Sequence, residues 1–224
     1  MAQQPPSILT KHQKRIFEAI VDERYFTDRY YLTGGTALSE FYLHHRLSED
    51  FDFFNDTEEV NPVRIARFWN IKGPALGLVK VEPRHALGLY EYFLYFDDGT
   101  KLLVDFSYYP FPRIEKKKKV GNLEIDSIYD IAVNKVHTVT MRQKARDYVD
   151  IYFILKEKGY QLRDLIMQAK AKFDWDISAV ELGTRLRDAQ HMTDFPRMLK
   201  PIDHKEWQEF FVKEAEKLKP EIFE

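Results

Sequence analysis

Residues 33–54 read TGGTALSEFYLHHRLSEDFDFF: a turn of small residues, a short amphipathic stretch, and two carboxylates separated by one apolar residue. Successive side chains of a β-strand alternate between its two faces, so Asp50 and Asp52 point to one side while Phe51 and Phe53 point to the other. Two negative charges held side by side repel each other. A divalent cation removes that repulsion, and Mg²⁺ in particular prefers one or two carboxylates together with substrate phosphates.

The small-residue turn before this strand is the second half of the pattern. Residues 30–32 are expected to form a strand, and Gly34 and Gly35 accept backbone angles that point successive N–H groups into one concavity. Thr36 is the expected N-cap of a helix over 37–45, whose positive end would face a triphosphate above the turn. A Gly-Gly pair alone is more often a plain turn, and strand ends often carry solvated carboxylates. The order of the two, with one helix between them, is the informative feature.

A third carboxylate lies in a later apolar segment. Residues 89–96 and 101–107 alternate as strands, and Asp97-Asp98-Gly99-Thr100 between them is typical of a hairpin turn. Asp105 lies inside the second strand, where an isolated buried carboxylate costs several kcal/mol unless it is paired, protonated or metal-bound. If this strand lies beside the Asp-x-Asp strand, the three carboxylates converge on one or two metal ions. Alternatively, Asp105 faces water on an edge strand.

The remaining segments predict an α+β fold, with a small mixed β-sheet in residues 1–125 and a helical domain in residues 126–224. A proline at the first helical position favours a helix start at Asn61-Pro62, and Lys72-Gly-Pro-Ala is expected to end that helix. The expected helices of the first part are 6–22 and 62–71, and its further strands are 77–82 and 120–124.

Residues 127–156 have helical periodicity, and Ser127-x-x-Asp130 is a capping signal. In one continuous helix, Lys135, Arg142 and Arg146 would fall within about 40° of one another, a cationic stripe suited to phosphate. Asp150 lies a little beyond and would pair with Arg146 or complete the metal site. Two helices with a break near 140–145 are an alternative, because Thr138-Val-Thr140 weakens helix propensity. A solvated charged face is another.

The segment before the Asp-x-Asp pair is polar. Arg46 and Ser48 could contact phosphate, or could pair with Glu49 and cap the strand. His44 and His45 have no second metal ligand at useful spacing, so we expect surface residues and no zinc site.

Together these residues resemble the AbiEii/AbiGii-type nucleotidyltransferases, toxins of abortive-infection and toxin–antitoxin systems in the polymerase-β-like superfamily. The resemblance covers roughly residues 30–155. It is carried by three stretches: Gly34-Gly-Thr-Ala-Leu38, Arg46-x-Ser-x-Asp-Phe-Asp52, and Asp130-Ile-Ala-Val-Asn-Lys135 followed by Arg142-x3-Arg-Asp-x2-Asp150.

The resemblance implies a role for each matching residue. Metal ligands would be Asp50, Asp52 and Asp105, and the phosphate pocket would be lined by Gly34 and Gly35. Lys135 and Asp150 would contact nucleotide or complete the site. Thr36, Arg46, Ser48 and Arg142 are the further candidate nucleotide contacts.

Composition limits the partners. With 34 basic and 36 acidic residues the net charge is −2, so nucleic acid could be held only locally. The chain has no cysteine, which excludes disulfides and a thiol nucleophile. The start, MAQQPP, lacks a signal pattern, and no run approaches the roughly 20 apolar residues of a membrane span, so a cytoplasmic protein without membrane contact is expected. Residues 116–119, four lysines, are the first place to look for RNA, although such runs are more often solubilising loops.

These observations predict a Mg²⁺- or Mn²⁺-dependent enzyme that transfers a nucleoside monophosphate from an NTP to an acceptor hydroxyl. By resemblance, the acceptor is expected to be RNA, such as a tRNA end, and the enzyme is expected to be a toxin with a separate antitoxin. Two other classes stay open: a non-catalytic nucleotide- or RNA-binding module, and a metal-dependent phosphohydrolase.

Overall fold

The computed structural model describes residues 6–219, and these residues form two compact units. The first consists of the described residues up to Tyr42 together with Ser48–Ser127. The second consists of Leu43–Leu47 together with the described residues from Ile128 onward. The first unit carries a mixed sheet and the second is helical, so the α+β class is confirmed.

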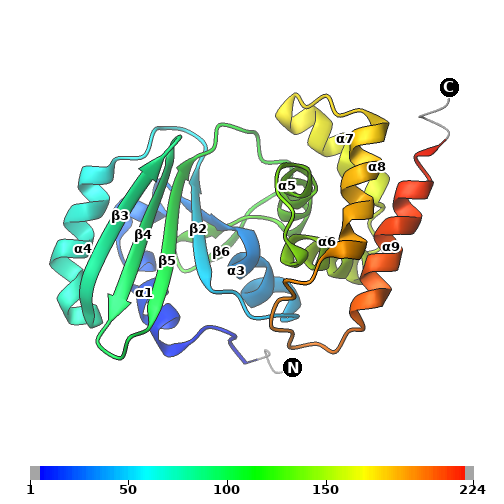
Figure 1. Ribbon diagram of the computed structural model, residues 1–224. Coiled ribbons are helices and arrows are strands. Elements are labelled where there is room, and N and C mark those ends of the chain that lie inside the picture. The colour runs from blue at the N-terminus through cyan, green and yellow to red at the C-terminus, as the bar shows by residue number, and fades with distance from the viewer. Residues whose placement is uncertain (1–5, 220–224) are drawn as a thin grey trace, which may run out of the picture. The chain divides into compact units, whose positions relative to one another are not determined.

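The first unit is built on one seven-stranded sheet in the order β3-β4-β5-β2-β1-β7-β6. Figure 1 shows β3, β4, β5 and β2 side by side. The β2–β5 and β1–β7 pairs are parallel and the other pairs antiparallel. The strands are β1 Tyr31–Thr33, β2 Asp50–Asn55, β3 Leu78–Ala86, β4 Leu89–Phe96, β5 Lys101–Tyr108, β6 Lys118–Val120 and β7 Leu123–Ile125.

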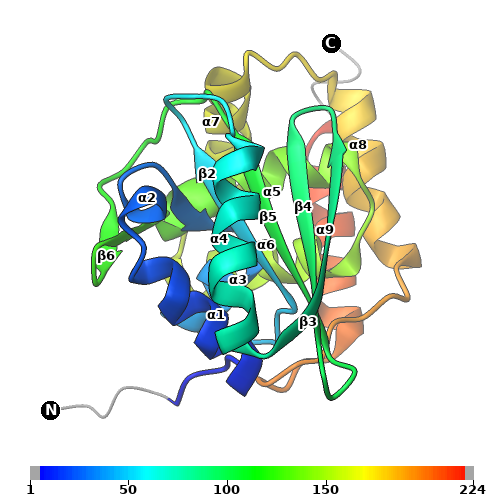
Figure 2. The same ribbon diagram turned by 90° about the vertical axis from the view of Figure 1, so that its left-hand side faces the viewer.

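Three helices, α1 (Lys11–Val21), α2 (Arg24–Thr27) and α4 (Pro62–Leu76), cover one face of this sheet. Figure 2 shows α1 and α4 lying across it. An aromatic core fills the space between: the ring of Phe26 from α2 lies 5.3 Å from that of Phe106 on β5 and 4.8 Å from that of Phe68 on α4. Phe51 and Phe53 of β2 belong to the same core and are fully buried. Strand alternation therefore places Asp52, the residue between them, on the other face.

The ends of several elements differ from those expected. Helix α1 begins at Lys11, not at residue 6, because Thr10 and Gln13 form a capping box there. Helix α4 continues through Pro74, and Gly77 ends it in the left-handed conformation. A proline in the last turn removes only one internal hydrogen bond, so it does not end the helix. The strand expected over 120–124 is a hairpin instead, β6 and β7, because Gly121 turns the chain with φ of 58°.

The hairpin of β4 and β5 is confirmed. The strands pair antiparallel from Leu89 opposite Ser107 to Tyr95 opposite Lys101, and Gly99 in the turn has φ of 80°. The N–H of Phe96 donates to the carbonyl of Thr100 at 3.0 Å.

The second unit consists mainly of helices: α5 Ile128–Met141, α6 Ala145–Lys158, α7 Leu162–Phe173, α8 Ala179–Arg187 and α9 His204–Glu216. Tyr148 and Trp207 are fully buried in its core. Residues 142–144 separate α5 from α6, which confirms the two-helix alternative. At the end of α5 the Thr138 and Thr140 hydroxyls donate to main-chain carbonyls of their own helix, a local bond that competes with regular helix.

The short segment Leu43–Leu47 belongs to the second unit, although in the chain it lies between the π-helical turn and β2 of the first unit. The N–H of Leu47 donates to the carbonyl of Arg197 at 2.8 Å, and the N–H of Leu199 donates to the carbonyl of His45 at 2.8 Å. These bonds hold the segment as a strand-like strip against residues 197–199. Among residues 6–219 no helix has the length and apolar character needed to cross a bilayer.

Candidate functional site

The expected carboxylates lie on neighbouring central strands of the first unit. Parallel pairing of β2 with β5 sets Asp52 opposite Asp105 and Asp50 opposite Leu103. Because β5 lies between β4 and β2, Asp105 is not on an edge strand, and that alternative is wrong. All three carboxylates are half-buried on the face that carries no aromatic core.

The carboxylates of the first unit would supply only part of the ligands of a metal ion. No group of three or more His, Cys, Asp or Glu side chains within residues 6–219 is arranged to hold one. Asp52 and Asp105, directly opposite each other, are the closest pair by register, at roughly the 5 Å spacing of neighbouring strands. Two carboxylates completed by substrate phosphates are the donor set that Mg²⁺ prefers, so the pair suits that ion together with a nucleotide.

Gly34 lies against Asp52. Its φ is 71°, a left-handed conformation, and a Cβ built there would overlap the Asp52 carboxylate, with the Asp52 Cγ only 2.8 Å away. Only glycine combines this conformation with such a close approach to the carboxylate. The turn and the Asp-x-Asp strand therefore meet in space.

The helix after the turn differs from the expected one. It begins at Gly34 as α3 (Gly34–Leu38) and continues as a π-helical turn, Ser39–Leu43. Thr33 is the N-cap residue, which corrects the assignment to Thr36, and its hydroxyl donates to Asp126 at 2.8 Å instead of capping the helix. Thr36 lies inside the helix and its hydroxyl donates to the main-chain carbonyl of Asp50. That bond ties the helix to the start of β2.

Ser48 joins the same region. Its hydroxyl lies 3.4 Å from Oδ1 of Asp50, and its carbonyl accepts a hydrogen bond from the Gln13 amide at 2.8 Å. The first unit thus brings together Gly34, Gly35, Thr36, Ser48, Asp50, Asp52 and Asp105.

The other predicted residues gather in the second unit, in an ionic cluster of His45, Arg46, Lys135, Asp147 and Asp150. Arg46 holds Asp150 with two hydrogen bonds, Nε to Oδ1 at 2.6 Å and Nη2 to Oδ2 at 2.7 Å. Lys135 Nζ lies 2.5 Å from Asp147 and 2.9 Å from Asp150. Arg142, on the outer side and half-exposed, donates to Asp147 at 3.0 Å. Asp147 and Asp150 are fully buried.

The cluster fixes the charge of its members. Burial alone would raise the pKa of Asp150, but Arg46 and Lys135 hold it well below its usual range. Burial alone would lower the pKa of Lys135, yet the attraction of Asp147 and Asp150 raises it overall. Both carboxylates and both cations are therefore ionised near neutral pH, and the expected phosphate partner Lys135 already has two carboxylate partners.

His45 is buried, so the expectation of a surface residue is wrong. Its Nε2 donates to Asp150 at 2.8 Å, because an ionised carboxylate only accepts, while Nδ1 meets no hydrogen-bond partner among the described residues. Burial lowers the pKa of His45 and outweighs the hydrogen bond and charge of Asp150, which raise it, while Arg46 and Lys135 lower it further. The imidazole is thus neutral.

Sequence reasoning missed His45, Asp147, Thr33 and Asp126 as partners of the predicted residues. Asp147 had a usable signal, because it precedes Asp150 by three positions and so shares its helix face. His45 and the Thr33–Asp126 bond join segments 105 and 93 residues apart, and no local pattern reports on such pairs. Of the lysine run 116–119, Lys118 and Lys119 are in β6 and not in a loop, and Lys117 Nζ lies 2.6 Å from Glu124.

Comparison with known proteins identifies the family of the chain. Residues 15–213 match the family model of the nucleotidyl transferase AbiEii toxins of type IV toxin–antitoxin systems. An uncharacterized protein of Aquifex aeolicus is 29% identical over 168 residues, which are 74% of this chain and 76% of that protein.

Solved structures share the fold. A putative nucleotidyltransferase from Helicobacter pylori has a TM-score of 0.61 at 20% identity, covering 95% of this chain and 96% of that one. The nucleotidyltransferase toxin MenT4 of Mycobacterium tuberculosis has a TM-score of 0.50 at 12% identity, covering 92% and 82%. The family match spans most of the chain, and the chain therefore belongs to the AbiEii nucleotidyl transferase toxins and is a nucleotidyltransferase.

Proposed function

We propose that this enzyme transfers a nucleoside monophosphate from an NTP to a hydroxyl group of an RNA acceptor, with Mg²⁺ as the metal ion. The observation that carries the proposal is the pairing of Asp52 with Asp105 beside the left-handed turn at Gly34. Because the carboxylates and the glycine turn are in close contact, a metal ion and a phosphate group could bind next to each other there.

Asp52 and Asp105 would hold the metal ion, with Asp50 on the same face as a further ligand. When bound, the ion would neutralise charge on the triphosphate and lower the pKa of the attacking hydroxyl. Gly34 lies against Asp52, Gly35 follows it in α3, and the Thr33 side chain leaves the first N–H groups of α3 uncapped. Those N–H groups suit phosphate oxygens.

The proposed reaction forms one bond and breaks one. The acceptor hydroxyl oxygen attacks the α-phosphorus, and the bond from that phosphorus to the bridging oxygen breaks, so pyrophosphate leaves with the bonding electrons. The hydroxyl proton passes to Asp105, the carboxylate opposite Asp52 on the adjacent strand. Lys135, Arg142 and Asp150 are proposed to contact the nucleotide or to complete the site. Arg46 holds the Asp150 carboxylate in place with two hydrogen bonds.

The proposal includes a partner. A type IV toxin family pairs a toxin with an antitoxin, and we propose that an antitoxin protein counteracts this enzyme. The acceptor is proposed as RNA from the resemblance to the AbiEii nucleotidyl transferase toxins.

The test incubates the protein with each of the four α-labelled NTPs, total RNA and Mg²⁺. Label in RNA together with pyrophosphate is the expected result, and Asp52→Asn abolishes both. Release of orthophosphate without labelled RNA would replace the proposal by a phosphohydrolase. Nucleotide binding without turnover in the presence of every RNA would replace it by a binding module.

A further inference from the structure

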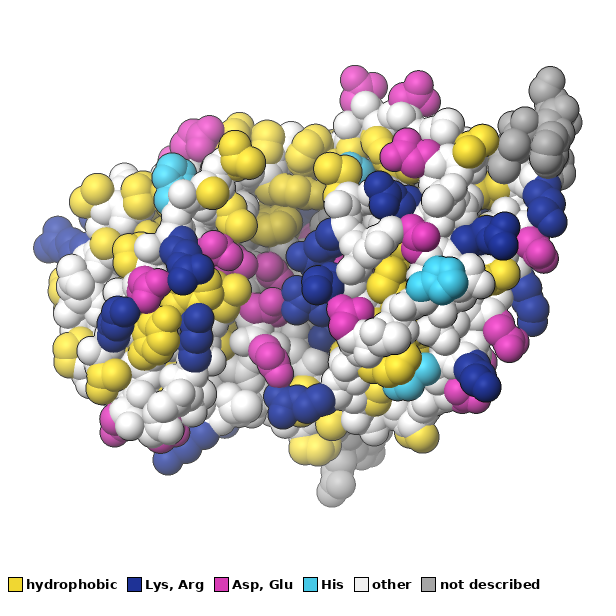
Figure 3. Space-filling view, in the orientation of Figure 1, with side chains coloured by type: hydrophobic (Ala, Val, Ile, Leu, Met, Phe, Trp, Pro, Cys, Tyr) yellow, Lys and Arg dark blue, Asp and Glu magenta, His cyan; other side chains and the backbone are white. Residues whose placement is uncertain are grey.

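The outer part of the sheet in the first unit carries a cation–aromatic patch, made of Lys80, Arg84, Phe93, Tyr95 and Lys101. Strand pairing places all five on one face: Lys80 is opposite Tyr95, and Tyr95 is opposite Lys101. Figure 3 shows basic side chains bordering hydrophobic ones over β3, β4 and β5.

The patch shares its face with the carboxylates. Phe93 is opposite Leu103, and Leu103 is opposite Asp50, so one cross-strand row leads from the patch to the site. Two strand spacings separate Phe93 from Asp50, roughly 10 Å. That distance corresponds to about three stacked nucleotides at about 3.4 Å each. Glu91, opposite both Arg84 and Asp105, lies in the next row.

Each ring has cations over it. The Arg84 guanidinium carbon lies 4.6 Å from the centre of the Phe93 ring, and Lys101 Nζ lies 4.0 Å from it. Lys80 and Lys101 lie 5.2 and 5.5 Å from the centre of the Tyr95 ring. Both rings are half-buried and the three cations over them are exposed, so a phosphate reaches the cations directly and a base reaches a ring when a cationic side chain moves off it.

The patch has surplus positive charge. Glu82 pairs with Lys80 at 2.9 Å and with Arg84 at 3.1 Å, and Glu91 is opposite Arg84, so two carboxylates neighbour three cations and the local balance is +1. The whole chain has a net charge of −2, so this concentration is local. An anion is the complementary partner.

The combination of ring faces and cations selects among anions. Proteins that hold single-stranded nucleic acid stack bases on aromatic side chains and place cations along the backbone, and both elements are present here. A polyphosphate or an acidic protein would use the cations and leave the rings unexplained.

We propose that the patch binds the single-stranded end of the nucleic-acid acceptor. Bases stack on Phe93 and Tyr95, phosphates contact Lys80, Arg84 and Lys101, and the terminal nucleotide follows the cross-strand row from Phe93 to Asp50. This inference rests on the proposed function, because it assigns the acceptor of that reaction to a surface.

The experiment measures binding of a fluorescein-labelled single-stranded 12-mer oligoribonucleotide by anisotropy, over a range of salt concentrations. Phe93→Leu keeps an apolar side chain and removes the ring, and it weakens binding about five- to a hundredfold. Lys101→Gln lowers the slope of log affinity against log salt by about 0.7. Tyr95→Leu is the second aromatic test if Phe93→Leu melts at a lower temperature than the wild type.

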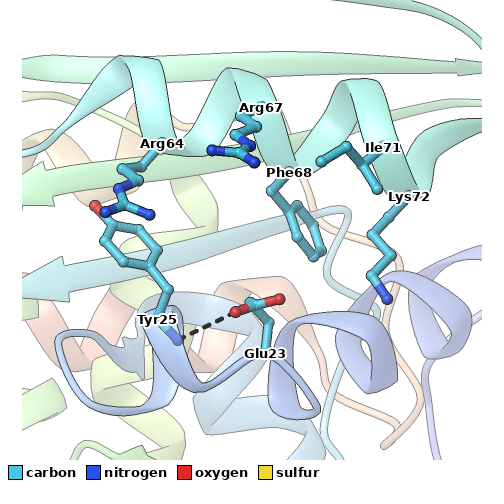
Figure 4. Close-up of a pocket in the computed structure, with 7 residues that line it drawn as sticks. All are labelled: Glu23, Tyr25, Arg64, Arg67, Phe68, Ile71 and Lys72. Carbon is cyan, nitrogen blue, oxygen red and sulfur yellow. Dashed lines mark hydrogen bonds between the residues drawn. The ribbon is translucent and has the colours of Figure 1, made fainter.

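A second basic surface of the same unit supplies the control. Arg67 and Lys72 of α4 line a pocket with Glu23 and Tyr25, on the helical side of the sheet (Figure 4). Arg67→Gln removes the same charge as Lys101→Gln but lies away from the patch, so it leaves the affinity within about twofold.

Three results would overturn the inference. The first is equal affinity of wild type and both aromatic variants. The second is an equal loss of oligonucleotide and inorganic polyphosphate binding in Lys101→Gln with no effect of either aromatic variant, which would indicate a simple polyanion surface. The third is a slope that changes by 2 to 3 only when lysines 116–119 are all changed to Gln, which would place the acceptor there.

NTP binding, followed as a Mg²⁺-dependent thermal shift, separates this inference from the proposed function. If NTP binds and is transferred but Phe93→Leu holds the oligonucleotide normally, the patch fails and the transferase stands. If the aromatic variants lose the oligonucleotide while the wild type never binds NTP, the patch stands and the transferase fails.

Discussion

Asp52 and Asp105 are Cα partners on the parallel strands β2 and β5, and Gly34 approaches the same Asp52 carboxylate so closely that no side chain fits between them. The parallel pairing joins strands that are about fifty residues apart in the chain, so the site depends on correct sheet assembly. The contact at Gly34 brings the turn to the carboxylates.

Replacing Asp52 by Asn is expected to leave the metal-free protein as stable as the wild type or slightly more stable, because one of two like charges disappears. A ligand present at a hundred times its Kd stabilises the folded state by about 2.7 kcal/mol. Mg²⁺ with NTP therefore raises the Tm of the wild type by several degrees and leaves that of Asp52→Asn unchanged. Asp28→Asn, on the exposed end of α2, is the control and keeps the full rise. An equal rise in Asp52→Asn would refute the metal assignment.

Gly34→Ala is expected to destabilise the protein by more than about 1–2 kcal/mol, the usual cost of a left-handed conformation for a residue with a Cβ. The excess comes from overlap with Asp52. Gly99→Ala is the matched control, since Gly99 has φ of 80° with nothing within 4 Å of the added Cβ. Urea denaturation measures both. Equal costs for the two variants would show that the contact at Gly34 is loose.

Lys135→Met is expected to reduce the free energy of unfolding by about 3–5 kcal/mol, because it leaves Asp147 and Asp150 short of a cation in a buried cluster. Lys156→Met provides the comparison, since the Lys156–Glu206 pair is half-exposed and such pairs contribute little. If Lys135 also neutralises the triphosphate, NTP affinity of the folded variant falls at least about tenfold in a titration at constant Mg²⁺. Unchanged stability would contradict the buried cluster.

Stability is expected to fall as the pH decreases below about 6.5. Burial lowers the pKa values of both His45 and His137, so the unfolded chain takes up these protons first and folding becomes less favourable as pH falls. Each fully shifted histidine contributes a slope of up to about 1.4 kcal/mol per pH unit between its folded pKa and 6.5. His45→Gln retains a donor toward Asp150 and removes its share of the slope, and His137→Gln removes the other. A slope unaltered in the double variant would disprove the assignment.

Asp147 and Asp150 act in a different pH range. Their folded pKa values are lowered, so their contribution is complete above about pH 4 and is lost as the pH falls further.

The local part of the site could be predicted from the sequence, and the non-local part could not. Alternation in Asp50-Phe51-Asp52-Phe53 is a property of any strand, so the two faces were predictable. The sequence could not show that β2 pairs with β5, because strand order in a sheet depends on packing between distant segments. Arg46 shows the limit most clearly: it lies four positions before Asp50 in the chain, yet its partner Asp150 is 104 residues away.

The predicted start of the helix after the glycine turn was wrong for a different reason. Thr36 fits the N-cap pattern, but Thr33 occupies that position and gives its hydroxyl to Asp126. Propensity describes a residue with its neighbours in sequence, whereas tertiary hydrogen bonds decide between two threonines three positions apart.

The strip Leu43–Leu47 also has a consequence for synthesis on the ribosome. At about 5 to 20 residues per second, the 104 residues between Arg46 and Asp150 take about 5 to 20 s to translate. During that interval the Asp-x-Asp strand has already been made, while the guanidinium just before it still lacks its carboxylate. The ionic cluster therefore closes late, and a chain cut short before α6 carries every carboxylate of the proposed metal site but cannot complete its second unit. For a toxin, this order of assembly means that prematurely terminated chains lack the buried Arg46–Asp150 pair, which holds the Leu43–Leu47 segment just before the Asp-x-Asp strand.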